Sequence, residues 1–208
     1  MNIVDFFLGP YLERRTELIV LELLAFIFGV WSVWMAKRAN IWVYPTGIIG
    51  TTITMHLFFT DRLLGDMLMN AYYSLMSIYG WWEWSRQKDG EKVRQITTMT
   101  SKEKGLGLAL VLITMLVTYM IYHVTNTAMD LSNVIDIFTS GVFFTAMWLM
   151  ARKKLESWIL WISADLITIP LYAYRGWGML SLQYLIFTIL AFQGYYAWRK
   201  SLHKNELQ

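Results

Sequence analysis

A carboxylate lies near the middle of a strongly apolar segment, at Asp165. Trp158, Trp161, Asp165 and Thr168 follow one another at spacings of three and four residues, so two indoles, a carboxylate and a hydroxyl share one helical face. A carboxylate at membrane depth is costly unless it is paired, neutralised or in contact with water. This composition suits a cage for an aromatic or cationic ring. The alternative is an aspartate that hydrogen-bonds neighbouring helices only as packing.

Two further apolar segments each carry a polar face. Because lipid cannot satisfy an amide or a phenol, such a face must point into the bundle or a cavity. We expect these faces to orient a polar ligand, and interhelical hydrogen bonding is the alternative for any single residue. The first face holds Asp66, Asn70, Tyr73, Ser77 and Gly80, with Met69 and Tyr72 beside it, and the second holds Gln183, Tyr184, Thr188 and Gln193.

Several other residues have weaker claims to a role. Asp136 and Glu22 are expected near the extracellular interface, and Glu83 is expected to be solvated. Backbone breaks are expected at Pro45, Gly47 and Pro170, which are candidate hinges. The aromatic residues at 81, 82, 84, 195, 196 and 198 are expected to anchor the helices at the membrane interface.

The sequence gives no indication of an enzyme or a cofactor. It has no phosphate-binding glycine loop and no cysteine, and its three histidines, His56, His123 and His203, lack metal-binding spacing. Uphill transport would need an ion, a partner protein or trapping of the product.

The composition indicates an all-α integral membrane protein. Apolar residues make up 56% of the 208 and mean hydropathy is +0.40, and a spanning helix needs roughly 20 apolar residues. The longest polar stretch runs from Ser85 to Lys104, which leaves no room for a soluble catalytic domain. Seven transmembrane helices are predicted, at 18–36, 41–60, 65–84, 105–124, 134–151, 157–174 and 180–198.

The basic residues lie mostly on one side of these spans. Four fall on the side of the N-terminus and 14 on the opposite side. The positive-inside rule therefore predicts an outside N-terminus and a cytoplasmic C-terminus in the cell inner membrane. The net charge of +3 is explained by this topology, and no nucleic-acid partner is expected.

An internal repeat divides the chain. Ala36-Lys37-Arg38 aligns with Ala151-Arg152-Lys153, and Trp42 with Trp158 after a gap, at an offset of about 115 residues. The segment 80–84 aligns with 194–198. The predicted plan is 3+1+3 with parallel repeats: an extracytoplasmic segment 1–17, a first bundle 18–84, a cytoplasmic loop 85–104, a linker helix 105–124, a second bundle 134–198 and a cytoplasmic tail 199–208. Such repeats place a transporter's substrate site between the halves.

Two motifs carry a resemblance to a known family. The stretch Leu64 to Tyr73 leads into Tyr79-Gly80-Trp81, and Trp158 to Asp165 follows a basic loop. Together they resemble the Pnu-type vitamin transporters, and especially their nicotinamide riboside (PnuC) branch, over essentially the whole chain.

The resemblance implies a SWEET-like fold, a homotrimer, and facilitated diffusion followed by phosphorylation by a cytoplasmic kinase. It implies that the substrate site includes Asn70, Tyr73, Trp161, Asp165 and Gln183. We add Trp158 and Asp66, which belong to the helical faces described above. Where typical nicotinamide riboside members have Asn in the second span, this chain has Gly50, so thiamin and riboflavin remain alternative vitamins. A non-transporting membrane scaffold is the alternative of a different class.

Overall fold

Seven long helices form the described part of the chain. The structure is a computed structural model that describes residues 6–7, 9–12, 14–61, 64–88, 91–92, 95–126 and 129–206. The helices are α2 (Thr16–Lys37), α3 (Val43–Thr60), α4 (Leu64–Ser85), α5 (Ser101–Val124), α6 (Leu131–Ala151), α7 (Glu156–Tyr174) and α8 (Gly178–Glu206). A 3-10 turn, η1 (Gly9–Tyr11), precedes them, and the antiparallel strands β1 (Gln87–Lys88) and β2 (Glu91–Lys92) follow α4. The all-helical class is confirmed, and α8 runs beyond the predicted end at 198.

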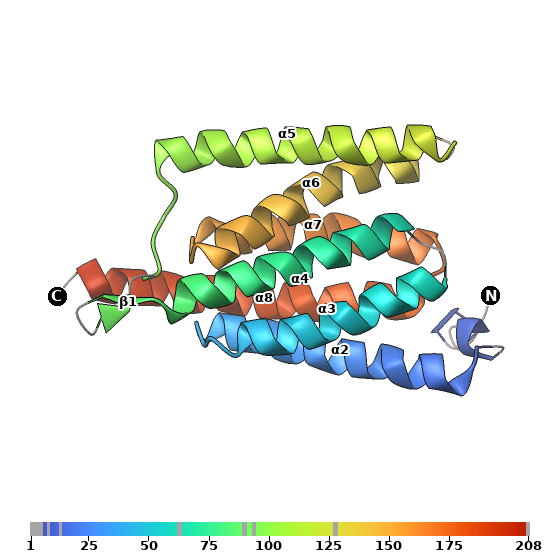
Figure 1. The fold of residues 1–208 in the computed structure, drawn as a ribbon, viewed down its shortest axis with the longest axis horizontal. Helices are drawn as coiled ribbons and strands as arrows, with labels where there is room; N and C mark the ends of the chain where they lie inside the picture. The colour runs from blue at the N-terminus through green and yellow to red at the C-terminus, as the bar shows by residue number, and fades with distance from the viewer. Residues whose placement is uncertain are drawn as a thin grey trace.

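Four of the described helices, α2, α5, α6 and α8, are long and apolar enough to cross a membrane. Their most apolar windows have mean hydropathies between 1.2 and 2.2. The other three helices, α3, α4 and α7, between them carry many hydroxyl, amide and carboxylate side chains, which lower their hydropathy. All seven run along one axis, and the two ends of the chain lie at opposite ends of the bundle (Figure 1). We call these the N-terminal and C-terminal ends of the bundle.

The helices pack as two units of three. In the first unit α3 contacts α2 and α4, and in the second α7 contacts α6 and α8. The units meet where α2 lies against α8 and where α4 lies against α6. Helix α5 lies at the edge and packs on α6 (Figure 1).

The turn after α2 and the turn after α6 have the same backbone geometry. Asn40 N–H donates to Met35 O, and Lys154 N–H donates to Leu149 O, each at 3.0 Å. Both turns are Schellman motifs with a left-handed non-glycine residue, at Ala39 (φ 50°) and Lys153 (φ 53°).

These turns correct the sequence alignment near the basic loops. Their equivalent hydrogen bonds lie 114 positions apart, which is one residue less than the offset that matched Ala36 to Ala151. Bonds in the first turns of α3 and α7 keep this offset: Tyr44 N–H donates to Ile41 O and Trp158 N–H donates to Leu155 O. Tyr44 and Trp158 therefore follow these two turns at equivalent backbone positions.

Four aromatic residues fill the C-terminal end of the bundle between the two units. Tyr44 packs edge-on against Trp84 at 5.0 Å, Trp158 packs edge-on against Trp198 at 5.5 Å, and the two inner indoles are 6.1 Å apart. Each inner indole N–H donates to a carbonyl of the other unit, from Trp84 to Ala151 and from Trp198 to Ala36, both at 3.0 Å. We call these four rings the aromatic quartet.

The prediction that Trp84 and Trp198 are interfacial anchors is wrong. They are 4% and 1% exposed. Trp81, Trp82 and Tyr196 are exposed, as that prediction requires. Aromatic content alone could not separate the two groups, because only the helical face that each residue occupies decides whether it meets lipid or the other unit.

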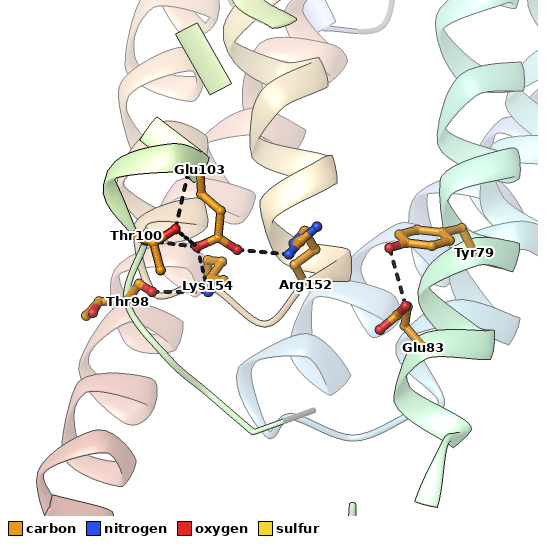
Figure 2. A network of polar contacts seen from close by, with 7 residues as sticks. All are labelled: Tyr79, Glu83, Thr98, Thr100, Glu103, Arg152 and Lys154. Carbon is orange, nitrogen blue, oxygen red and sulfur yellow. Dashed lines mark hydrogen bonds and ion pairs between the residues drawn. The ribbon is translucent and has the colours of Figure 1, made fainter. Parts of the chain in front are cut away.

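Polar contacts attach the start of α5 to the turn between α6 and α7. Figure 2 shows Glu103 between Lys154 (2.8 Å) and Arg152 (3.0 Å), with Thr100 completing a capping box at the helix start. Backbone bonds join the same two segments, from Thr97 N–H to Lys153 O and from Leu155 N–H to Thr97 O. We call this set of contacts the strap.

Two further predictions about local structure are corrected. Glu83, expected in solvent, is 3% exposed and lies 3.5 Å from the Arg86 guanidinium. It also lies 3.4 Å from the Tyr79 hydroxyl (Figure 2). Pro45 lies in the first turn of α3, where the helix needs no N–H donor, so it breaks no helical hydrogen bond. Pro170 does lie inside α7.

Replacement of Glu103 by alanine should destabilise the protein by about 3 kcal/mol, because it leaves two cations of the strap without their buried partner. The free energy of unfolding by detergent titration measures this. Lys102→Ala, an exposed change in the same helical turn, is the matched control and should have almost no effect. Equal stability of Glu103→Ala and the parent would contradict the role assigned to the strap.

Replacement of Gly194 by alanine should cost about 1–3 kcal/mol, because its Cβ would lie 2.6 Å from the Trp158 ring. Gly105→Ala is the control, since no atom lies within 4 Å of its added Cβ, and it should be neutral or slightly stabilising. Thermal unfolding of both variants in the same detergent tests this. An unchanged midpoint for Gly194→Ala would mean that the quartet is not closely packed.

Candidate functional site

A cavity of about 440 Å³ runs between the two three-helix units. This volume is in the range of small-molecule sites. All seven residues predicted for the substrate site line it: Asp66, Asn70, Tyr73, Trp158, Trp161, Asp165 and Gln183. They come from α4, α7 and α8, which are the three helices whose polar faces the sequence singled out. Their role in binding stays a prediction.

One wall of the cavity is aromatic. The Trp161 ring lies 5.5 Å from that of Phe143 and 6.2 Å from that of Tyr73. Tyr184 continues this surface at 5.8 Å from Phe143. Rings from α4 and α6 therefore pack against Trp161, and Tyr184 of α8 joins the same cluster through Phe143. Tyr73, Trp161 and Tyr184 line the cavity, whereas Phe143 is outside its lining. Aromatic faces of this kind attract a flat or cationic ligand.

Asp165 is the unusual member of the lining. It is 2% exposed, and its Oδ1 has no hydrogen-bond partner among the described residues. A buried carboxylate oxygen without a partner is expensive, and a ligand that carries a positive charge or a hydrogen-bond donor would satisfy it. The Trp158 Nε1 is also buried without a described partner, and it belongs to the same wall.

The first unit forms the opposite wall. Its lining includes small and hydroxyl-bearing residues, among them Gly29, Ser32, Gly47, Gly50, Thr51 and Ser77, beside apolar and acidic ones such as Phe26, Leu57 and Asp66. Ser77 belongs to the predicted polar face of α4, whereas Ser32 and Thr51 were not predicted. The Ser32 hydroxyl donates to Val43 O at 2.8 Å, and the Thr51 and Ser74 hydroxyls are 2.7 Å apart. Single hydroxyls in α2 and α3 give no sequence signal, because lone serines and threonines in membrane helices usually bond to their own backbone.

The N-terminal segment lines the cavity at the N-terminal end of the bundle. Phe7, Pro10, Tyr11 and Arg14 contribute to the lining there. Arg14 Nη2 lies 2.8 Å from Asp61 Oδ2, and its Nε lies 3.7 Å from Glu22 Oε2. Tyr11 donates its hydroxyl to Glu22. Glu22, expected at the extracellular interface, thus holds the N-terminal segment beside the end of the cavity that this segment lines.

Burial and the bond to Glu22 raise the pKa of Tyr11 above its ordinary value, so this phenol stays protonated as a donor. Asp136, the other carboxylate expected at this interface, lies outside the cavity lining. It accepts from Tyr122 and lies 3.8 Å from Arg175.

Three further residues of the predicted stripes, Met69, Ser77 and Tyr184, also line the cavity. Gly80, Tyr72, Thr168, Thr188 and Gln193 lie outside its lining. Thr168 is 1% exposed, with no described partner for its hydroxyl. Tyr72 donates to Phe144 O and stacks on that ring at 3.8 Å. Thr188 bonds to Tyr184 O, and Gln193 accepts from Lys37 Nζ at 2.8 Å.

The geometry suits binding and not chemistry. Within the described residues, no group of three or more histidines and carboxylates could hold a metal ion. What the cavity offers is an aromatic wall with one unpaired carboxylate, facing a wall of small hydroxyl-bearing residues. An aromatic cation with a polar substituent complements both walls.

Comparison with known proteins gives the family. Residues 19–200 match the family model described as nicotinamide mononucleotide transporter. The nicotinamide riboside transporter PnuC of Escherichia coli (strain K12) is 24% identical, over 89% of this chain and 87% of that protein. The riboflavin/roseoflavin transporter RibM of Streptomyces davaonensis is 23% identical, over 83% of this chain and 81% of that protein.

A solved structure shares the fold. It is described as the crystal structure of the vitamin B3 transporter PnuC, with a TM-score of 0.71 and 23% identity, over 88% of this chain and 82% of that one. The family model covers far more than half of the sequence, and the matched region contains all seven cavity residues predicted from the sequence. The chain therefore belongs to the nicotinamide mononucleotide transporter family.

Proposed function

We propose that this multi-pass protein of the inner membrane transports nicotinamide riboside by facilitated diffusion. The observation that carries the proposal is the unpaired Asp165 oxygen beside the aromatic wall. Nicotinamide riboside carries a pyridinium cation, which a tryptophan face and a carboxylate can hold together. Related transporters named for this vitamin support the same substrate.

The cavity suggests the route. It reaches from the N-terminal segment to Tyr44 and Trp158, and beyond these two residues the indoles of Trp84 and Trp198 fill the bundle. We propose that the vitamin enters from the N-terminal end and leaves when the aromatic quartet separates. Phosphorylation of the vitamin by a cytoplasmic kinase would then retain it in the cell, so uptake would not need to be coupled to an ion gradient.

We further propose the 3+1+3 plan of parallel, SWEET-like repeats. The identical turns after α2 and α6 support it, as do the paired contacts of Gly80 with Tyr44 and of Gly194 with Trp158. We also propose a homotrimer. The exposed apolar residues of α5, including Leu112 and Leu116, leave a surface that a neighbouring copy or lipid could cover.

Thiamin is the second candidate substrate, because it is also an aromatic cation. Riboflavin is the third, supported by the relative named as a riboflavin/roseoflavin transporter. Riboflavin carries no positive charge, so it would gain little from Asp165. The scaffold alternative explains neither the cavity nor the unpaired carboxylate.

Titration calorimetry with nicotinamide riboside, thiamin and riboflavin should show tightest binding of nicotinamide riboside to the purified protein. Trp161→Ala and Asp165→Asn should each weaken that binding by about tenfold or more, the worth of a desolvated cation contact. Trp82→Ala, which removes a 57% exposed indole, is the control and should bind like the parent. Binding of none of the three vitamins by monodisperse protein would refute the proposal.

Orientation can be tested cleanly because the chain has no cysteine. We expect a membrane-impermeant maleimide to label Met129→Cys in intact spheroplasts, and to label Lys204→Cys only after the membrane is permeabilised. Both positions are exposed, at opposite ends of the bundle. The reverse pattern would contradict an outside N-terminus.

A further inference from the structure

We propose that a groove between α2 and α8 binds one anionic phospholipid, with an acyl chain along the groove and the phosphate beside Lys37 and Arg38. We call it the α2–α8 groove. It is lined by Phe26, Ile27, Val30, Trp31, Trp34 and Leu190. The proposal goes beyond transport, because it assigns a second ligand to a different face of the bundle.

The α2–α8 groove is apolar and opens outward. Its volume is about 320 Å³. Its lining on α2 runs from Phe26 to Trp34, which is about 12 Å along a helix axis. Ile27 and Trp31 are 47% and 46% exposed, so in a membrane this face meets lipid. Such a groove accommodates an acyl chain, but by itself it favours no particular headgroup.

Two cations lie at one end of the groove and supply that preference. The Arg38 guanidinium lies 3.7 Å from the ring centroid of Trp34, the last groove residue on α2. Lys37 Nζ donates to Gln193 Oε1 at 2.8 Å, and Gln193 is three residues beyond Leu190 on α8. Both charges are therefore held at the C-terminal end of the bundle, which we predict to be cytoplasmic.

The matching turn of the second unit shows what the first unit lacks. Arg152 lies over the ring of Trp148, four residues before it, at 5.4 Å, in the same arrangement as the pair at the groove. Arg152 also has an acidic partner, because Glu103 lies 3.0 Å from it (Figure 2). In the described part of the chain, neither Lys37 nor Arg38 forms an ion pair with a carboxylate. A lipid phosphate supplies the anion that the first unit does not contain.

A lipid in this groove contacts both three-helix units. Helix α2 lies against α8 where the units meet (Figure 1). Phe26 lines both the groove and the cavity between the units. A free phosphate would use the two cations and leave the groove empty, whereas an anionic phospholipid uses both features. The bound lipid therefore adds to the Lys37–Gln193 bond in joining the units.

Native mass spectrometry of the purified protein in a neutral detergent tests the proposal. The protein is titrated with dioleoyl phosphatidylglycerol and with dioleoyl phosphatidylcholine, which share their acyl chains and differ in net charge. The parent should bind the phosphatidylglycerol about tenfold more tightly or better, as expected for two cations near a lipid headgroup. Lys37→Gln combined with Arg38→Gln should remove this preference.

Lys102→Gln combined with Lys104→Gln is the matched control. It removes two positive charges from exposed residues of α5 at the same end of the bundle. This variant should keep the preference of the parent, because both lysines lie outside the groove.

A third variant, Val30→Trp, tests the position of the acyl chain. The larger side chain fills the groove, so it should weaken the binding of both lipids. Val30 is only partly buried, so the fold should accept the change.

The outcomes are distinct. A preference lost only with Lys37 and Arg38 supports the site, even if Val30→Trp fails to fold. No preference in the parent, or an equal loss in both double variants, would overturn it, because general attraction to a basic surface would then explain the binding. Unchanged lipid binding by Val30→Trp would overturn the placement of the chain. A changed number of copies in its mass spectrum would make the groove an interface between copies and overturn the lipid assignment.

Discussion

Two indole N–H groups, of Trp84 and Trp198, hold the halves of this bundle together at one end. Each donates to a carbonyl in the last turn of a helix in the other half. Carbonyls in a last helical turn lack the usual i+4 partner, and an apolar interior supplies no water for their free lone pairs. The inner indoles in turn pack against Tyr44 and Trp158, respectively. The floor of the cavity, and therefore its depth, depends on this pair of contacts.

The two halves line the cavity with different chemistry. The first half contributes hydroxyls such as that of Thr51, and the second contributes the Trp161 indole and the Asp165 carboxylate. Similar backbones thus present different chemistry to the same space. A buried carboxylate destabilises a protein that has no ligand for it, which makes Asp165 easier to understand as a binding group than as a packing group.

The sequence predicted what depends on local pattern. Long apolar segments identified the helices, and polar residues at helical spacing identified the three helices that carry the predicted site. The sequence-based prediction failed where tertiary packing alone determines whether a side chain is buried. Trp84 and Glu83 look like interfacial residues by position, yet both are buried, and Trp84 owes this to Tyr44 and Ala151, which are distant in sequence. Similar residue types at the basic loops aligned Ala36 with Ala151, whereas the matching hydrogen bonds of the two turns lie 114 positions apart.

The strap makes the two halves mechanically unequal. In the second half, backbone bonds and the Glu103 ion pairs fix the α6–α7 turn to the linker helix, and Met99 N–H adds a bond to Glu156 at 2.9 Å. In the first half, the end of α2 bonds to the other unit through Lys37 Nζ to Gln193 Oε1 and through the Trp198 indole to Ala36 O. If the two halves rotate relative to each other, the second half and α5 should therefore move together as one rigid body, and α2 to α4 should move relative to it.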